Sequence, residues 1–182
     1  MNHYTAGFHM PATGEYHMLA LKITDVKDFT NKLFIGEVFD RFWLNEASIT
    51  TFSTFSIDGK LQPDFFDSDE KEILASGKRT YALWKELKPY CFSIIRGKKT
   101  PLFFKLVFQF PPERIFTPQN DGTGIYPDIN GLFLNIQFKN NLLMCTTGVS
   151  LKTFIPGVKP DALWDSKILE FFRKNQIVFE EV

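Results

Sequence analysis

The stretch LFLNIQFKNNLLMCTTGV, residues 132–149, shows the clearest structural pattern in the chain. Apolar residues recur at every second position on both sides of Asn140-Asn141, which predicts two strands that each bury one face. Asparagine tolerates positive φ, so this pair suits a two-residue hairpin turn. Cross-strand partners share a face, and a one-residue slip would turn the apolar set to solvent. The predicted register pairs Phe138 with Leu143, Ile136 with Cys145, Leu134 with Thr147 and Leu132 with Val149.

Outward from this hairpin, the same alternation predicts further strands. Residues 19–23 form one, and residues 102–110 form another, with Leu102 and Phe110 on the apolar face and Lys105 and Gln109 on the opposite face. Residues 38–44 and 49–57 are rich in aromatic and β-branched residues, which favours two strands joined by a turn at Asn45-Glu46. Asp58-Gly59 is a turn signal that ends the second of them.

Four segments carry helix signals. Asp25 caps a helix that ends by Gly36, and Asp67 and Glu70 have capping-box spacing for a short helix that ends at Gly77. A longer helix is expected from Arg79 or Thr80 to about 95, with a kink or short break at Pro89. Pro160-Asp161 opens the last helix, and residues 177–182 add a short extended piece. The order β-α-β-β-α-α-β-β-β-α predicts an α+β fold: antiparallel sheet(s) with about four helices.

The first seventeen residues differ from the rest. They are rich in Gly, Pro and Thr and contain all three histidines, His3, His9 and His17. We expect residues 1–17 to be a disordered or non-native N-terminal segment, with Met18 as the natural start; the alternative is a genuine arm that docks on the body. Residues 18–182 are then expected to form a single α+β domain without histidine.

Composition limits the classes of function. Lys+Arg and Asp+Glu both number 21, and zero net charge lowers the expectation of nucleic-acid binding, which usually brings a basic excess. The two cysteines, Cys91 and Cys145, show no metal-site or disulfide pattern and are expected to be structural. No apolar run approaches the length of a membrane span, and no signal peptide is visible. We therefore predict a cytoplasmic protein with no cofactor, no metal and no membrane partner.

Candidate binding residues fall in two places, and no residue is predicted to be catalytic. One place is the only notable basic cluster, and the other is the glycine loop 120–124, because loops on rigid scaffolds often carry function. The alternative for the cluster is a solvated helix end, where cations complement the helix dipole. The candidates are Lys85, Lys88, Arg96, Lys98, Lys99, Asn120 and Asp121.

Several stretches together resemble a known family. They are LKITDVKDF (21–29), SITTFSTFSIDGKL (48–61), RGKKTPLFFKLVFQ (96–109), NGLFLN (130–135) and CTTGVSLKTF (145–154), followed by a Trp-bearing helix that ends in Phe-Phe. The chain from residue 18 resembles an uncharacterised family of small proteins from clostridial-type bacteria, a domain of unknown function. The resemblance implies a bacterial cytoplasmic protein, and it transfers no catalytic residue.

Three functional hypotheses remain open. The first is a non-catalytic cytoplasmic binding or adaptor domain with an unknown protein or nucleic-acid partner. The second is a nucleic-acid-associated accessory protein, since the order of elements faintly resembles that of DNA sliding clamps. The third is a hydrolase or transferase that uses carboxylate or cysteine chemistry.

Overall fold

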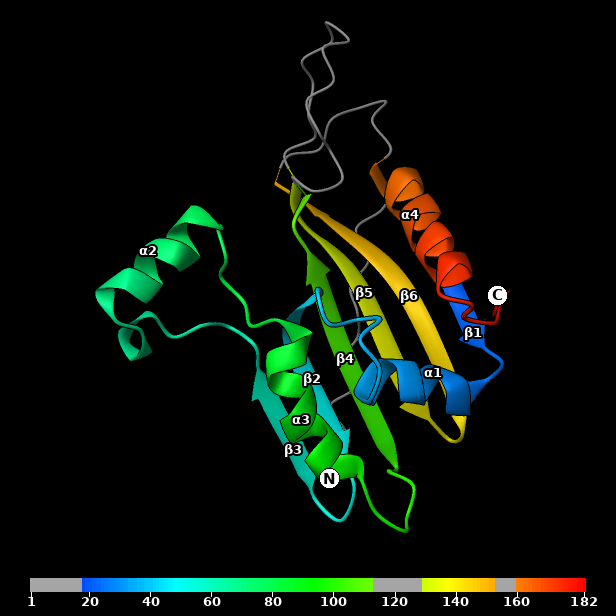
Figure 1. The fold of residues 1–182 in the computed structure, drawn as a ribbon. Coiled ribbons are helices and arrows are strands. Elements are labelled where there is room, and N and C mark those ends of the chain that lie inside the picture. The colour runs from blue at the N-terminus through cyan, green and yellow to red at the C-terminus, as the bar shows by residue number, and fades with distance from the viewer. Residues whose placement is uncertain (1–17, 113–128, 153–159) are drawn as a thin grey trace, which may run out of the picture.

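The computed structural model in Figure 1 describes residues 18–112, 129–152 and 160–182. Within these ranges the chain forms four α-helices, a short 3-10 turn and one sheet of seven antiparallel strands. The predicted α+β class and the predicted order of elements are therefore confirmed. The strands are β1 (Ala20–Ile23), β2 (Trp43–Thr50), β3 (Thr54–Asp58), β4 (Phe103–Phe110), β5 (Ile129–Lys139), β6 (Leu142–Leu151) and β7 (Phe179–Glu181), and the helical elements are α1 (Val26–Phe34), η1 (Pro63–Phe65), α2 (Ser68–Ser76), α3 (Trp84–Ile95) and α4 (Pro160–Lys174).

The hairpin that decides the fold forms as predicted. β5 and β6 pair in the expected register, with Phe138 opposite Leu143 and Ile136 opposite Cys145. Asn140 and Asn141 have φ angles of 52° and 61°, the positive values that a two-residue hairpin turn requires. This hairpin lies inside the sheet, whose strand order is β3-β2-β4-β5-β6-β1-β7.

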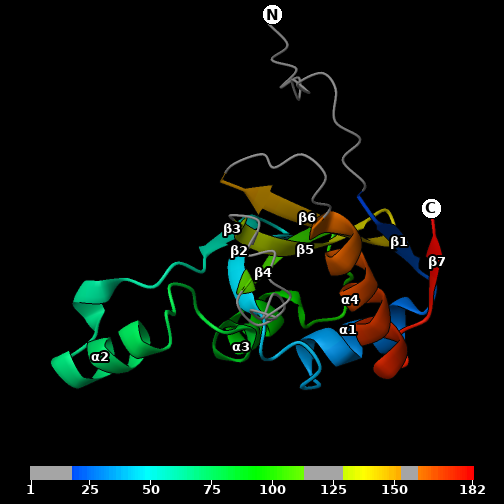
Figure 2. The ribbon, with the colours of Figure 1, turned by 90° about the horizontal axis from the view of Figure 1, so that it is seen from above.

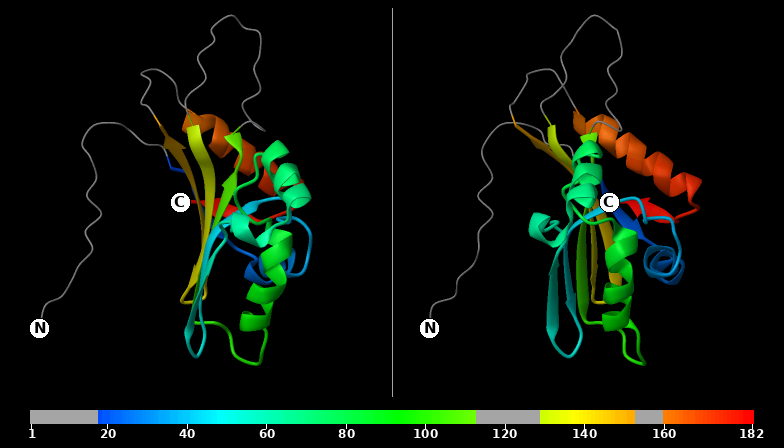
Figure 3. Two further views of the ribbon diagram at one scale, coloured as in Figure 1. Left: turned by 90° about the vertical axis from the view of Figure 1, so that its left-hand side faces the viewer. Right: turned by 60° about the vertical axis from the view of Figure 1, so that its left-hand side comes forward.

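Helices α1, α3 and α4 cover one face of the sheet, as Figures 2 and 3 show. The interface is rich in aromatic rings. Trp84 of α3 packs edge-on against Phe34 of α1 and Phe108 of β4, while Phe104 stacks on Phe138 of β5. Such rings bury large apolar area, so this layer supplies most of the favourable free energy of folding. No described helix covers the opposite face.

Residues 60–81, which we call the arm, project from the β2–β3 side of the sheet and carry α2 (Figure 1). The predicted capping box is present: the amide of Glu70 donates to Asp67, and the amide of Asp67 donates to the Glu70 carboxylate. No residue of α2 is buried, so the helix depends on its cap rather than on a core. A bridge between Lys60 and Tyr81 closes the base of the arm.

The predicted strands at 38–44 and 49–57 were placed wrongly. Asn45 does not turn the chain, because it lies inside β2 at a bulge where the ladder with β4 shifts between Leu44 and Glu46. The extra residue breaks the alternation that a continuous strand would show. The side-chain amide of Asn45 donates to the side-chain oxygen of the buried Gln109 at 3.1 Å. The true turn follows Thr50, and residues 36–42 are not a strand.

The predicted start of the third helix was also wrong. Leu83 forms an isolated bridge with Trp43, so residues before Trp84 are held in extended contacts rather than in a helix. Pro89 does not break α3, which runs on from Trp84 to Ile95. Pro89 is the sixth of the twelve residues of α3, so it removes one hydrogen bond from the helix interior without ending the helix. Two residues of the predicted strand 102–110 also differ from the prediction. Leu102 was expected on the buried face but is exposed, because it precedes β4. Gln109 was expected on the polar face but is buried.

Candidate functional site

The candidate site lies at one end of the sheet, where three connections meet: the β2–β3 turn, the α3–β4 loop and the β5–β6 turn (bottom of Figure 1). Strand pairing fixes their proximity. Thr50 pairs with both Thr54 and Phe103, and Phe103 pairs with Lys139. Lys139 pairs in turn with Leu142. These residues form one row across neighbouring strands, so the connections that leave the row are held side by side.

Five exposed cations lie on the segments at or beside this end of the molecule. Arg96 follows the last residue of α3, and Lys98 and Lys99 lie in the loop that continues to β4. Lys27 lies in the first turn of α1, next to Val26, which lines the same cavity as Lys98 and Lys99. None of the five forms an ion pair with another described residue. We call this set the basic end: Lys27, Arg96, Lys98, Lys99 and Lys139.

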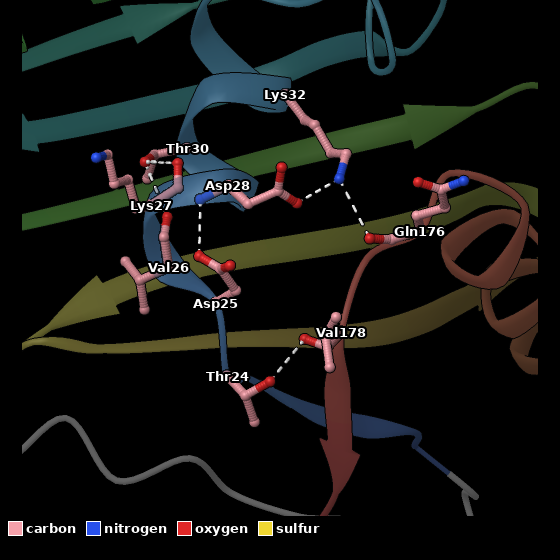
Figure 4. A network of polar contacts seen from close by, with 9 residues as sticks. All are labelled: Thr24, Asp25, Val26, Lys27, Asp28, Thr30, Lys32, Gln176 and Val178. Atoms are coloured by element: carbon pink, nitrogen blue, oxygen red, sulfur yellow. Dashed lines mark hydrogen bonds and ion pairs between the residues drawn. The ribbon is translucent and has the colours of Figure 1, made fainter.

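Two carboxylates of the α1 region lie near these cations, and both have local roles (Figure 4). Asp25 accepts a hydrogen bond from the amide of Asp28 at 2.9 Å and so caps the helix. The carboxylate of Asp28 binds the ammonium of Lys32, which also donates to the carbonyl of Gln176 at 3.2 Å. Asp28 is thus neutralised within its own helix. The cations of the basic end therefore give this surface a positive potential, although the whole chain has no net charge.

An open cavity of about 270 Å³ lies between α1, the α3–β4 loop and the ends of β4 and β5. Its lining combines apolar side chains with the two lysines of the loop. The hydroxyl of Thr30 is already engaged, because it donates to the carbonyl of Val26 at 2.8 Å. The cavity thus offers an apolar wall beside cations, a combination that suits an amphipathic anion. The lining residues are Val26, Thr30, Ile95, Gly97, Lys98, Lys99, Thr100, Pro101, Phe104 and Phe138.

The structure divides the basic residues that the sequence grouped together. Lys88 is largely buried, and its ammonium donates to the carboxylate of Asp40 at 2.5 Å and to the carbonyl of Gly36 at 2.6 Å. Its charge therefore holds α3 to the segment after α1. Lys85 is exposed in the first turn of α3, about 16 Å along the helix axis from Arg96. Only Arg96, Lys98 and Lys99 of the predicted cluster meet at the basic end.

The sequence analysis missed two members of the basic end, and two further residues that it predicted to bind a partner are not tested by the structure. Lys27 and Lys139 are distant in sequence from Arg96, and only the pairing of β4 with β5 brings Lys139 to the same row. The signal for Lys139 was present, since the predicted hairpin already placed it beside the turn. The predicted binding residues Asn120 and Asp121 lie outside the described residues.

Both cysteines are buried. Burial raises the pKa of the Cys91 thiol to about 12, and it also raises the pKa of Cys145. A thiol with such a pKa is almost wholly protonated at neutral pH, whereas the nucleophile in cysteine catalysis is the thiolate. Among residues 18–112, 129–152 and 160–182, no group of three or more His, Cys, Asp or Glu side chains could hold a metal ion.

We predict that neither thiol of the folded protein reacts with iodoacetamide at pH 8 on a timescale of minutes. For Cys91, a pKa of about 12 leaves roughly one thiolate in ten thousand at that pH, and burial blocks access as well. Intact mass after a timed quench measures the extent of labelling. The same protein in strong urea is the control, and there both cysteines should label fully. Rapid stoichiometric labelling of the folded chain would contradict this prediction and would revive a cysteine-based enzyme.

Comparison with known families assigns the chain to one of them. A family model described as "Family of unknown function (DUF5721)" matches residues 32–180, which is most of the sequence. The chain belongs to this family. The resemblance to a domain of unknown function is thereby confirmed. No curated protein and no solved structure matches the chain. The DUF5721 match includes the α3–β4 loop and the β5–β6 hairpin, and hence four of the five cations of the basic end.

Proposed function

We propose that this DUF5721 chain is a non-catalytic cytoplasmic binding domain that holds an anionic partner at its basic end. One observation supports this most: three sequence-distant segments near one end of the sheet carry five exposed cations, and none of the five has an ion-pair partner among the described residues. Like charges held together on a surface repel one another, and an anionic partner relieves that repulsion. The nearby side chains that could act as a nucleophile or a base also favour binding over catalysis. Cys91 is buried, and Asp25 and Asp28 have structural roles.

The strength of such binding can be bounded. Each exposed ion pair contributes roughly 0.2–1 kcal/mol, so three cations together contribute up to about 3 kcal/mol. This upper bound amounts to about a 150-fold change in affinity. The interaction should weaken with added salt, because exposed charges are screened over a Debye length of about 8 Å at physiological ionic strength.

The test uses the full chain and heparin, a simple polyanion, at pH 8, where the histidines of residues 1–17 are neutral. We expect the protein to bind labelled heparin at low salt, measured by fluorescence anisotropy. The triple variant Arg96→Gln, Lys98→Gln, Lys99→Gln should bind about 10- to 100-fold more weakly.

A matched control removes the same charge elsewhere. Lys71, Arg173 and Lys174 are exposed cations of α2 and α4, and their replacement by Gln changes the net charge by the same three units. This control should keep most of the affinity for heparin. The proposal fails if the wild-type chain does not bind heparin at low salt, or if the control variant loses as much affinity as the test variant.

A further inference from the structure

Three large apolar side chains project from the same end as the five cations, and we call them the apolar tips. Phe52, in the β2–β3 turn, is 93% exposed. Leu102, in the α3–β4 loop, is 68% exposed, and Leu142, after the β5–β6 turn, is 44% exposed. Backbone pairing holds them together: the amide of Leu102 donates to the carbonyl of Thr50 at 2.9 Å, one residue before the turn that carries Phe52.

Single exposed apolar residues on a surface are ordinary and need no explanation. Here, however, the apolar tips come from three different parts of the chain, and two of them lie close to cations of the basic end. Leu102 follows Lys98 and Lys99 in one loop, and Leu142 is the cross-strand partner of Lys139. Alternating cations and apolar side chains on neighbouring loops match the boundary of a lipid bilayer, where headgroups meet acyl chains.

We propose that the basic end docks on the surface of an anionic lipid bilayer, with Phe52, Leu102 and Leu142 inserted between headgroups that the cations bind. This proposal rests on the proposed function, since it names the anion that the basic end holds. The cytoplasmic leaflet of cell membranes carries anionic lipids and attracts clusters of lysine and arginine. Charge complementarity therefore selects the surface, and the apolar tips add a contribution that salt does not screen.

The apolar tips favour lipid over nucleic acid. A single-stranded nucleic acid is bound by cations together with aromatic rings on which bases stack. Leu102 and Leu142 are aliphatic and cannot stack in this way, whereas a bilayer rewards the burial of any apolar side chain. The expectation that no membrane is involved came from the lack of a long apolar run. Among the described helices none is long and apolar enough to cross a bilayer, and docking on a surface requires no such helix.

The experiment measures sedimentation of the full chain with vesicles. One set of vesicles is phosphatidylcholine alone, and the other contains about one-third phosphatidylserine, which makes the surface anionic. Each Lys or Arg near an anionic surface strengthens binding by about fivefold. We expect binding to the anionic vesicles and little binding to the neutral ones. The triple variant Arg96→Gln, Lys98→Gln, Lys99→Gln should lower the partition coefficient on the order of 100-fold.

Variants of the apolar tips separate docking from simple charge attraction. Phe52→Ser with Leu102→Ser should lower binding to anionic vesicles by at least about tenfold, because transfer of apolar area from water is lost. The matched control replaces two equally exposed apolar residues of the arm, Phe65→Ser with Ile73→Ser, and should leave binding unchanged. In a Phe52→Trp variant the fluorescence should shift to shorter wavelength on binding, which reports insertion.

Each outcome decides between the two proposals. Binding to heparin without binding to anionic vesicles overturns the lipid assignment and leaves the proposed function standing. Equal vesicle binding by wild type and by the Phe52→Ser, Leu102→Ser variant overturns insertion of the apolar tips. Retardation of nucleic acid at low salt together with no vesicle binding also overturns the lipid assignment and favours a nucleic-acid partner. Failure to bind either heparin or vesicles overturns both proposals.

Discussion

Replacement of Trp84 by alanine is expected to lower the free energy of unfolding by about 4 kcal/mol, because truncation of a buried tryptophan removes apolar contacts and leaves a cavity. Trp84 is fully buried at the start of α3. Its ring centroid lies 5.7 Å from that of Phe34 and 5.2 Å from that of Phe108, so it joins α1, α3 and β4. The indole nitrogen donates to the carbonyl of Leu33 at 2.7 Å.

Urea unfolding followed by circular dichroism measures this effect, with an unchanged m-value showing that the two-state transition is preserved. Trp84→Phe is the intermediate variant: it keeps an aromatic ring but leaves the buried Leu33 carbonyl without its donor, which costs about 1–3 kcal/mol. Tyr90→Ala is the control on the same helix, because Tyr90 is exposed, and it should change stability by less than about 0.5 kcal/mol. Trp84→Ala and Tyr90→Ala with equal stability would contradict the assignment of Trp84 as the anchor of α3.

The fold could be predicted where the pattern was local. The β5–β6 hairpin needs only an alternating sequence and two asparagines, and its register was correct at every pair named. β2 could not be placed, because a bulge at Asn45 is stabilised by Gln109, a residue 64 positions away. Alternation along the sequence carries no information on such a partner, so the bulge was interpreted as a turn.

The candidate site shows the same division. Arg96, Lys98 and Lys99 are contiguous, and the sequence alone grouped them. Phe52 and Lys139 join them only because β4 pairs with both β2 and β5, and the choice of these neighbours depends on the whole sheet. Conversely, a lysine close in sequence can be used elsewhere, as when Lys88 binds Asp40 on a segment 48 residues away. Proximity along the chain therefore gave three of the five cations of the basic end and two residues too many, Lys85 and Lys88.

Substitution of Gly59 by alanine is expected to destabilise the protein by about 3 kcal/mol or more, since overpacking against rigid atoms forces the backbone to move. A Cβ at Gly59 would lie 1.8 Å from the carbonyl oxygen of Leu44 and 2.7 Å from its carbonyl carbon. Both atoms belong to the backbone of β2, so no side chain can rotate away. The φ angle is not the obstacle, because it lies outside the left-handed region. The sequence indicated only a turn here, whereas the structure shows that the chain after β3 approaches β2 too closely for any side chain.

Gly59 also joins the arm to the sheet, which determines how the damage should appear. Its amide donates to the carbonyl of Asn45 at 3.0 Å, and its carbonyl accepts from the amide of Ala82 at 2.8 Å. Displacement of Gly59 therefore strains the bulge in β2 and the return of the chain from the arm together. Limited proteolysis should cut residues 60–81 of Gly59→Ala faster than those of the wild type, in step with the loss of stability in urea. Gly97→Ala is the matched control, because no atom lies within 4 Å of a Cβ there, and it should be neutral or slightly stabilising. Equal stability of the two variants would show that Leu44 can move away at little cost, and the close approach of β2 to Gly59 would then not constrain this edge of the sheet.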